Sequence, residues 1–368
     1  MLSGAKGHML LMMLAGLMLL AGLWAGLGRL GWNLPQPGTG LAGLHGPLMV
    51  SGFLGTLIGL ERAMAVESVW AYSAPVFAAL GALALLAGFT PLVGQILILF
   101  GSLILVAIFA RLFHRHGSPS LATMALGAIV WAVGNGLWMM GYPLYRVVPW
   151  WVGFLVLTIA GERLELSRLL RLSFLSRIGF SAAGGMLVFS LVASLVAFDA
   201  AIRMAGIGLV AFAGWLLRYD IAWRIVSHPG LHRFMALCLL TGYVWLGTGG
   251  FMWVGFASEF RAGPLYDAML HTIFLGFVFS MIFAHASIIL PSITGMTMPF
   301  QAAFYGHWVL LQLSLVLRVG GDLTQWRPGI QWGGLLNVLA LLIFLANNIR
   351  AVRIGELAGR EPLKGWGT

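Results

Sequence analysis

Charged residues are scarce in this chain, since Asp, Glu, Lys and Arg make up only 9% of its 368 residues. Soluble domains carry about 25% charged residues, so this sequence cannot cover a water-facing surface. Intrinsic disorder is excluded as well, because 60% of the residues are hydrophobic and disordered chains are poor in such residues. A protein that crosses the membrane many times remains, and the length suffices for about a dozen spans of roughly 20 residues.

Cysteine and the common catalytic motifs are also nearly absent. The single cysteine, Cys238, lies in an apolar run, so neither an intrachain disulfide nor a cysteine metal site is expected. No Cys-x-x-Cys-His sequence occurs, which means that any haem would be held without a covalent bond. Phosphate-binding loops and the Gly-x-Ser-x-Gly motif are missing too.

Apolar runs between polar breaks predict an all-α, polytopic protein with about twelve transmembrane helices in a single membrane domain, residues 1–368. The first run is too long for the core of a signal peptide, so we read it as a span. Only Asp199 and Arg203 mark the break between the seventh and eighth runs. The twelve runs are 8–28, 43–60, 70–89, 92–110, 120–141, 147–161, 179–198, 201–217, 234–256, 265–290, 302–319 and 332–349.

Basic residues are distributed unevenly between the two ends of these spans. With a cytoplasmic N-terminus, 15 Lys and Arg residues fall on the inner side and 6 on the outer side. This bias satisfies the positive-inside rule, so both termini are expected in the cytoplasm. The formal net charge of +10 is then explained by membrane anchoring, and no nucleic-acid partner is expected.

A weak internal repeat links the second and sixth spans. The second span ends in Leu60-Glu61-Arg62 and the sixth in Gly161-Glu162-Arg163. One reading is common ancestry within three four-span units. The other is that both are ordinary span ends, each with a Glu-Arg pair at the membrane surface.

Histidine is the residue type most suited to chemistry inside these spans. Spans two and ten both enter from the outer side, so His45 in the first turn of one and His271 about two turns into the other share the outer half of the membrane. A neutral imidazole is a good axial ligand for haem iron. The two histidines are therefore candidate ligands on opposite faces of one haem. The alternative is that each only forms a hydrogen bond between helices.

His285 and His307 form a second candidate pair, for copper or a second haem. His285 follows His271 on the same helix face, about 21 Å further toward the inner side, and His307 lies about two turns into a span that starts inside. Four further histidines near basic segments are read as interface residues, and Pro229-Gly230 breaks any helix between the last two. These are His114, His116, His228 and His232.

The sequence around the central histidines resembles the NnrS family of membrane proteins. The resemblance implies a twelve-helix bundle like subunit I of haem–copper oxidases, with haem and also copper as expected cofactors and a role in nitric oxide metabolism. Carried over to this chain, the bis-histidine haem of that fold has His45 and His271 as its ligands. The matching segments are His45-Gly46-Pro47 through Phe53, Leu270-His271 through Gly276, Ser292–Gly295 and Leu317-Arg318-Val319.

The chain departs from this family and from true oxidases in several places. Gly46-Pro47 stands where the family has a longer His-Glu-Met type of run, and Pro291–Gly295 lacks an expected histidine. The His-Pro-Glu run and the His-His pair of oxidases are missing. An oxygen-reducing centre and proton pumping are therefore not expected.

The sequence thus predicts a multi-pass protein of the bacterial inner membrane with non-covalent haem b at His45 and His271, and copper as a further candidate cofactor. Its expected role is electron transfer or the handling of nitric oxide or another small gas, with a redox protein or the gas as partner. Two alternatives stay open: a metal-free secondary transporter and a structural subunit of a respiratory complex.

Overall fold

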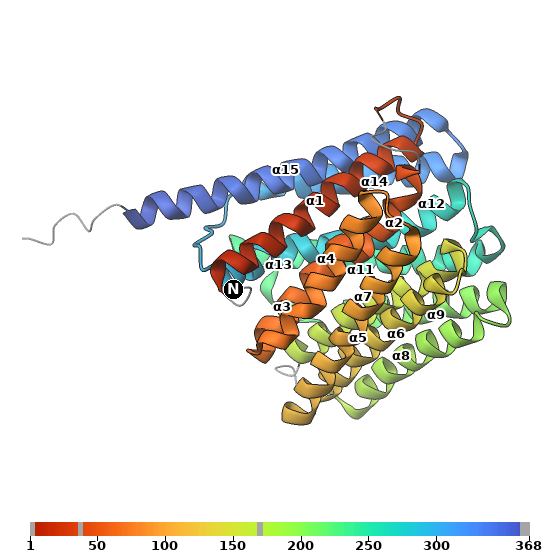
Figure 1. Ribbon diagram of the computed structural model, residues 1–368, viewed down its shortest axis with the longest axis horizontal. Coiled ribbons are helices and arrows are strands. Elements are labelled where there is room, and N and C mark those ends of the chain that lie inside the picture. Colours follow the sequence, from red (N-terminus) through yellow and green to blue (C-terminus); the bar gives the residue numbers. More distant parts are fainter. Residues whose placement is uncertain (1–3, 36–39, 168–171, 361–368) are drawn as a thin grey trace, which may run out of the picture.

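The computed structural model describes residues 4–35, 40–167 and 172–360, which fold as an up-and-down bundle of helices without a strand (Figure 1). The predicted all-α, polytopic fold is therefore confirmed. The helices of the first half are α1 (Ala5–Arg29), η1 (Leu41–Leu44), α2 (His45–Pro47), η2 (Leu48–Gly55), α3 (Thr56–Val66), η3 (Val69–Tyr72), α4 (Ser73–Leu86), α5 (Pro91–His116), α6 (Pro119–Met139) and α7 (Leu144–Leu166).

The second half continues the same alternation. Its helices are α8 (Phe174–Ala193), α9 (Phe198–Tyr219), α10 (Ala222–Ile225), α11 (Leu231–Gly255), η5 (Ala257–Glu259), α12 (Pro264–His271), η6 (Thr272–Phe279), α13 (Ser280–Thr294), α14 (Phe304–Thr324) and α15 (Arg327–Arg360).

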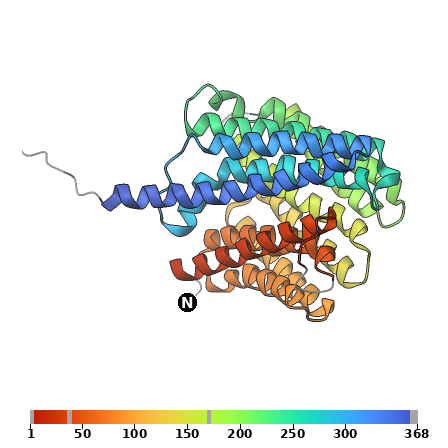
Figure 2. The ribbon, with the colours of Figure 1, turned by 90° about the horizontal axis from the view of Figure 1, so that it is seen from above.

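Within the described ranges, eleven helical segments are long and apolar enough to cross a membrane. The 21-residue α14, which carries Arg318 and Asp322, is a twelfth long helix of the bundle. Figures 1 and 2 place the start of α1 and the end of α15 at the same end of the bundle, as an even number of crossings requires. We call this the inner end and the opposite one the outer end; which of them faces the cytoplasm stays a prediction from the charge bias.

The break between the seventh and eighth spans lies earlier than the sequence suggested. Helix α8 ends at Ala193 and α9 begins at Phe198. Asp199 and Arg203 therefore lie inside the first two turns of α9 rather than between the spans. A carboxylate in the first turn interacts favourably with the helix dipole, so Asp199 is compatible with a helix start.

Glycine contacts allow the closest helix crossings. A Cβ atom on Gly206 in α9 would lie 2.6 Å from the carbonyl oxygen of Gly250 in α11, and one on Gly250 would lie 2.8 Å from the oxygen of Gly206. Small residues let membrane helices approach in this way. The buried side chains of the described residues form one continuous core, and α7 has the most buried membrane-spanning window at 78%.

Two of the arginines included in the charge count are buried within helices. Arg163 in α7 and Arg318 in α14 are 2% and 7% exposed. Each pairs with an aspartate, Asp220 and Asp267 respectively. A count of charges cannot distinguish a solvated arginine from a buried one, because burial depends on whether another helix supplies an acidic partner.

The glycine crossing predicts the outcome of a paired substitution in α9. Gly206→Val should force α9 and α11 apart and destabilise the protein by about 1–3 kcal/mol. Gly214→Val in the same helix should cost little, because a Cβ at Gly214 meets nothing within 4 Å. Thermal unfolding of the detergent-solubilised protein measures both, and equal losses in the two variants would contradict the close crossing.

Candidate functional site

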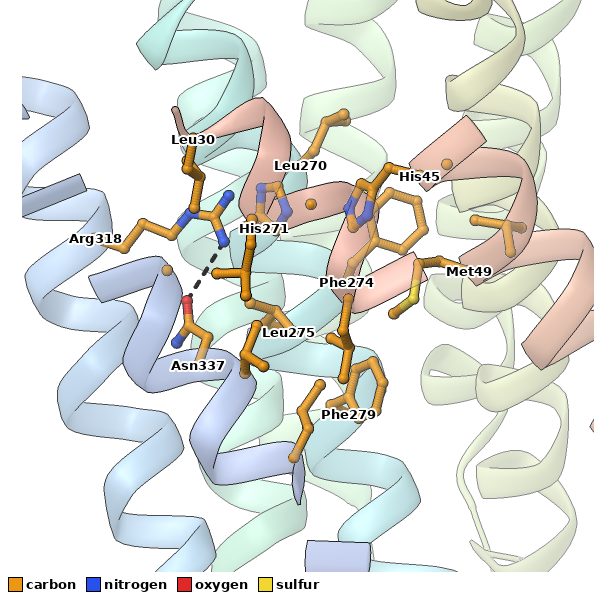
Figure 3. Close-up of a pocket in the computed structure, with 18 of the residues that line it drawn as sticks. Leu30, His45, Met49, Leu270, His271, Phe274, Leu275, Phe279, Arg318 and Asn337 are labelled. Carbon is orange, nitrogen blue, oxygen red and sulfur yellow. Dashed lines mark hydrogen bonds between the residues drawn. The ribbon is translucent and has the colours of Figure 1, made fainter. Parts of the chain in front are cut away.

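His45 and His271 lie next to each other near the outer end of the bundle. Their ring centroids are 6.1 Å apart and the ring planes form an angle of 26°. Figure 3 shows the two imidazoles side by side, one from the start of the second span and the other from the tenth. The predicted proximity of this pair is therefore present in the structure.

One nitrogen of each imidazole is committed to a backbone carbonyl. Nδ1 of His45 is 2.7 Å from the oxygen of Gly22, and Nδ1 of His271 is 2.9 Å from the oxygen of Asp267. A carbonyl oxygen only accepts hydrogen bonds, so each neutral ring carries its proton on Nδ1. The Nε2 atoms then keep their lone pairs, which is the arrangement found in histidines that ligate metals.

Two glycines of α1 provide the space in which His45 packs. A Cβ on Gly26 would lie 3.0 Å from both Cε1 and Nδ1 of His45, and one on Gly22 would lie 2.6 Å from Sδ of Met49. The four-residue spacing of these glycines places both on one face of α1. Helix α1 can therefore approach the second span closely enough for the Gly22 carbonyl to meet the imidazole.

Both histidines precede a π-helical segment of eight residues. One covers Leu48–Gly55 and the other Thr272–Phe279. Proline has no N–H to donate, so Pro47 gives a local reason for the first change of helical repeat. In the second π-helical segment, the ring of Trp245 packs directly against Gly276, and its Cγ would lie 2.4 Å from a Cβ added at this glycine. Such irregular turns are frequent at functional sites, and sequence reasoning did not foresee them.

An ion pair supports His271 from the outer side. Arg318 donates to both carboxylate oxygens of Asp267, at 2.8 Å from Nε and 3.0 Å from Nη2. The Asp267 carboxylate also lies 3.2 Å from Nδ1 of His271. A carboxylate behind a ligating imidazole fixes its orientation and raises its basicity. In the sequence, this ion pair is indicated only by Arg318, a basic residue within the eleventh apolar run.

Two cavities meet at the histidine pair. The deeper one is largely apolar and has a volume of about 100 Å³. The other, of about 210 Å³, lies beside Arg29, Asp267 and Asp322. Both share His45, His271, Arg318, Gly26 and Leu30. The apolar cavity is lined in addition by Leu23, Met49, Val50, Trp151, Phe274, Leu275, Phe279 and Val338 (Figure 3).

The donor set fits a bis-histidine metal, whereas the space fits a whole porphyrin only after side chains move. Two imidazoles whose Nε2 atoms point at one metal have ring centroids roughly 6 Å apart; the rings here are 6.1 Å apart and stacked at 26°. A cavity of about 100 Å³ is small beside the ~300–1,000 Å³ of ligand pockets. Flexible Met49 and neighbouring Phe274 line it, and these are the side chains that would turn away.

His285 lies in a different environment, next to a cation. Its Nδ1 is 2.8 Å from the carbonyl oxygen of Met281, and its Nε2 is 3.2 Å from Nη1 of Arg163. Arg163 in turn donates to both carboxylate oxygens of Asp220, at 2.7 and 2.9 Å. With one nitrogen donating to a carbonyl and the other accepting from a guanidinium, this imidazole has no lone pair left for a metal.

His307 is enclosed by aromatic rings. The amide nitrogen of Asn347 is 3.2 Å from the carbonyl oxygen of Ala303 and 3.1 Å from Nδ1 of His307, so Nδ1 accepts and the proton lies on Nε2. The Phe283 and Phe344 rings lie 4.6 and 5.3 Å from the imidazole. No ring contact joins His285 to His307 among the residues described. The structure therefore does not bring the second predicted pair to one site.

The described part of the chain contains no group of three or more His, Cys, Asp or Glu side chains that could hold a metal ion. His228 and His232 do approach, with ring centroids 6.4 Å apart. Both are exposed, and α11 begins only at Leu231, so the predicted break between them is present. His114 and His116 lie in the exposed last turn of α5.

Fold and site together define a class: a polytopic all-helical membrane protein with two paired imidazoles near one end of its bundle. Residues 8–353 match the model of a family described as Domain of unknown function (DUF8744). The chain belongs to that family. A comparison with curated proteins gave no match.

The ion pair behind His271 predicts a large effect on stability. Arg318→Gln should destabilise the protein by about 3 kcal/mol, because it leaves the Asp267 carboxylate without its partner. Arg261→Gln is the matched control: Arg261 and Asp199 are 3.5 Å apart and 61% and 44% exposed, and such pairs contribute less than about 1 kcal/mol.

Thermal unfolding of both variants, of Asp267→Asn and of the double variant Asp267→Asn/Arg318→Gln provides the measurement. The double variant should be less destabilised than the sum of its two single variants, since the partners interact directly. Equal losses in Arg318→Gln and Arg261→Gln would be inconsistent with a stabilising buried pair.

Proposed function

We propose that this protein binds one haem b non-covalently between His45 and His271 and serves in electron transfer in a bacterial inner membrane. The observation that carries the proposal is the stacked imidazole pair, each ring bonded through Nδ1 to a backbone carbonyl, with the ring centroids 6.1 Å apart. When bound, such a haem supplies reversible one-electron transfer or binding of a diatomic gas.

The residues around the pair support a role in holding a redox group. Asp267, fixed by Arg318, orients the His271 ring and increases the electron density on its Nε2. The Gly22 carbonyl does the same for His45. Apolar side chains line most of the adjoining cavity, and a hydrophobic shell of this kind limits the access of water and influences the redox potential.

The arrangement favours electron transfer over gas handling. Two histidine ligands leave no open position on an iron, whereas binding of a gas requires one. The resemblance to the NnrS family, with its nitric oxide role and its oxidase-like bundle, supports gas handling as the second candidate. We do not extend the proposal to copper, because His285 and His307 have other partners.

A visible spectrum of the purified protein is the direct test. The reduced-minus-oxidised difference should show b-type bands with about one haem per chain, and His45→Ala and His271→Ala should each lower haem occupancy by at least about tenfold. His228→Ala and His232→Ala are matched controls, since these rings are similarly close but exposed, and both should keep the bands.

The elution profile of each variant shows whether it remains folded. A wild-type protein that stays colourless after expression with ample haem would refute the proposal. If substrate uptake into vesicles then survived replacement of all four central histidines, a metal-free transporter would be favoured. Loss of a partner enzyme's activity, without a chromophore in this chain, would favour a structural subunit.

Carbon monoxide distinguishes the two haem-based roles. Because both axial positions are filled by histidines in the proposal, the spectrum of the reduced wild-type protein should not change when carbon monoxide is added. A shift of the main absorption band within minutes would show an open or easily opened position. That result would keep the haem but replace electron transfer by gas binding.

A further inference from the structure

A groove runs along the lipid-facing side of α6, α7 and α8, far from the histidine pair. It has a volume of about 690 Å³, much larger than either cavity beside the imidazoles. Leu157 and Leu164 of buried α7 form its floor, while Leu126 of α6 and Gly184 and Gly185 of α8 line its walls. Figure 1 shows α8 at the edge of the bundle opposite α15, so this groove belongs to the outer surface of the molecule.

The two glycines of α8 keep the groove open. A Cβ on Gly185 would meet nothing within 4 Å, and one on Gly184 would make only an ordinary contact with Phe212 at 3.5 Å. Exposed apolar side chains flank these glycines on α8, among them Met186 and Phe189. The groove therefore opens laterally toward the hydrocarbon of the bilayer.

The inner end of the groove is polar and attracts negative charge. Helices α6 and α8 both begin there, at Pro119 and Phe174, each capped by a serine hydroxyl, that of Ser118 and that of Ser173. The dipole of a helix start still favours anions. Exposed Arg177 adds a full positive charge one turn into α8, and its Nη2 donates to the Leu172 carbonyl. The Ser120 hydroxyl donates to Glu165, so anion recognition at this end depends on Arg177 and the helix starts.

The length of the groove indicates what occupies it. From Arg177 to Gly185 a helix rises about 12 Å, which is close to half of the ~30 Å hydrocarbon core. A transmembrane helix of a partner would need the full thickness. One leaflet is the depth available to the acyl chains of a single lipid.

We propose that this groove binds one anionic phospholipid of the leaflet at the inner end, with its headgroup at Arg177 and an acyl chain along Leu126, Leu157 and Gly185. The apolar walls bury the chain, and the basic mouth selects the headgroup. This site is independent of the haem proposal, because it shares no residue with the histidine pair.

Native mass spectrometry of the detergent-purified full-length chain tests the site, with phosphatidylglycerol as the anionic lipid and phosphatidylcholine as the zwitterionic one. The wild type should prefer phosphatidylglycerol. Gly185→Leu should fill the groove without a clash and abolish tight binding of one lipid. Gly214→Leu is the matched control, because Gly214 is exposed in α9 with nothing near its added Cβ, and it should bind as the wild type does.

The headgroup is tested separately. Arg177→Gln should reduce the preference for phosphatidylglycerol about fivefold, whereas Arg224→Gln, an exposed arginine in α10, should leave it unchanged. The proposal is overturned if Gly185→Leu retains the lipid, if Arg177→Gln keeps the full preference, or if the bound molecule lost from Gly185→Leu is a neutral quinone instead of a phospholipid.

Discussion

Hydrocarbon offers no hydrogen-bond partner, so every polar group inside a membrane bundle must find one within the protein. This constraint organises both ends of the molecule. Near the outer end it joins Arg318 to Asp267 and, through that carboxylate, to His271. At the inner end Arg163 pairs with Asp220. The Arg163–Asp220 pair also holds together spans that have no loop in common, whereas the Arg318–Asp267 pair joins the consecutive tenth and eleventh spans.

The paired-histidine site meets the same constraint with only one nitrogen of each imidazole. The carbonyls of Gly22 and Asp267 take the Nδ1 protons, which leaves two Nε2 lone pairs in one small space. The other central histidines differ: His285 accepts from a guanidinium, and the free N–H of His307 faces aromatic rings. The first pair therefore differs from the other central histidines in the partners of its second ring nitrogens.

The two Glu-Arg segments have similar sequences but make different contacts in the bundle. Arg62 donates to both Glu61 and Glu162, so the ends of the second and sixth spans meet directly at the inner end. Arg163, the corresponding residue of the second segment, turns instead toward Asp220. The two segments therefore have different contacts, since Arg62 joins the two glutamates and Arg163 does not.

Much of the architecture could be read from the sequence. The apolar runs locate most spans to within about six residues, although α15 continues well past the predicted end of the last span to Arg360. The alternation of inward and outward spans was enough to place His45 and His271 at one depth. Polar residues are less well determined. The burial of Arg163 and Arg318 and the partners of His285 and His307 do not follow from the one-dimensional pattern, because it gives depth but not rotation of a helix about its axis.

Scarcity of charge and the length of the apolar runs therefore establish a multi-pass helical protein and the heights of its histidines, since both depend only on transfer of each segment from water to lipid. Tertiary structure decides which side chains face each other. The meeting of the two imidazoles, the ion pair behind one of them, the π-helical segments beside both, and the open groove along α6 and α8 arise from packing between distant spans. No local preference of the chain specifies that packing, because it is set by how glycines and bulky side chains of different helices fit together.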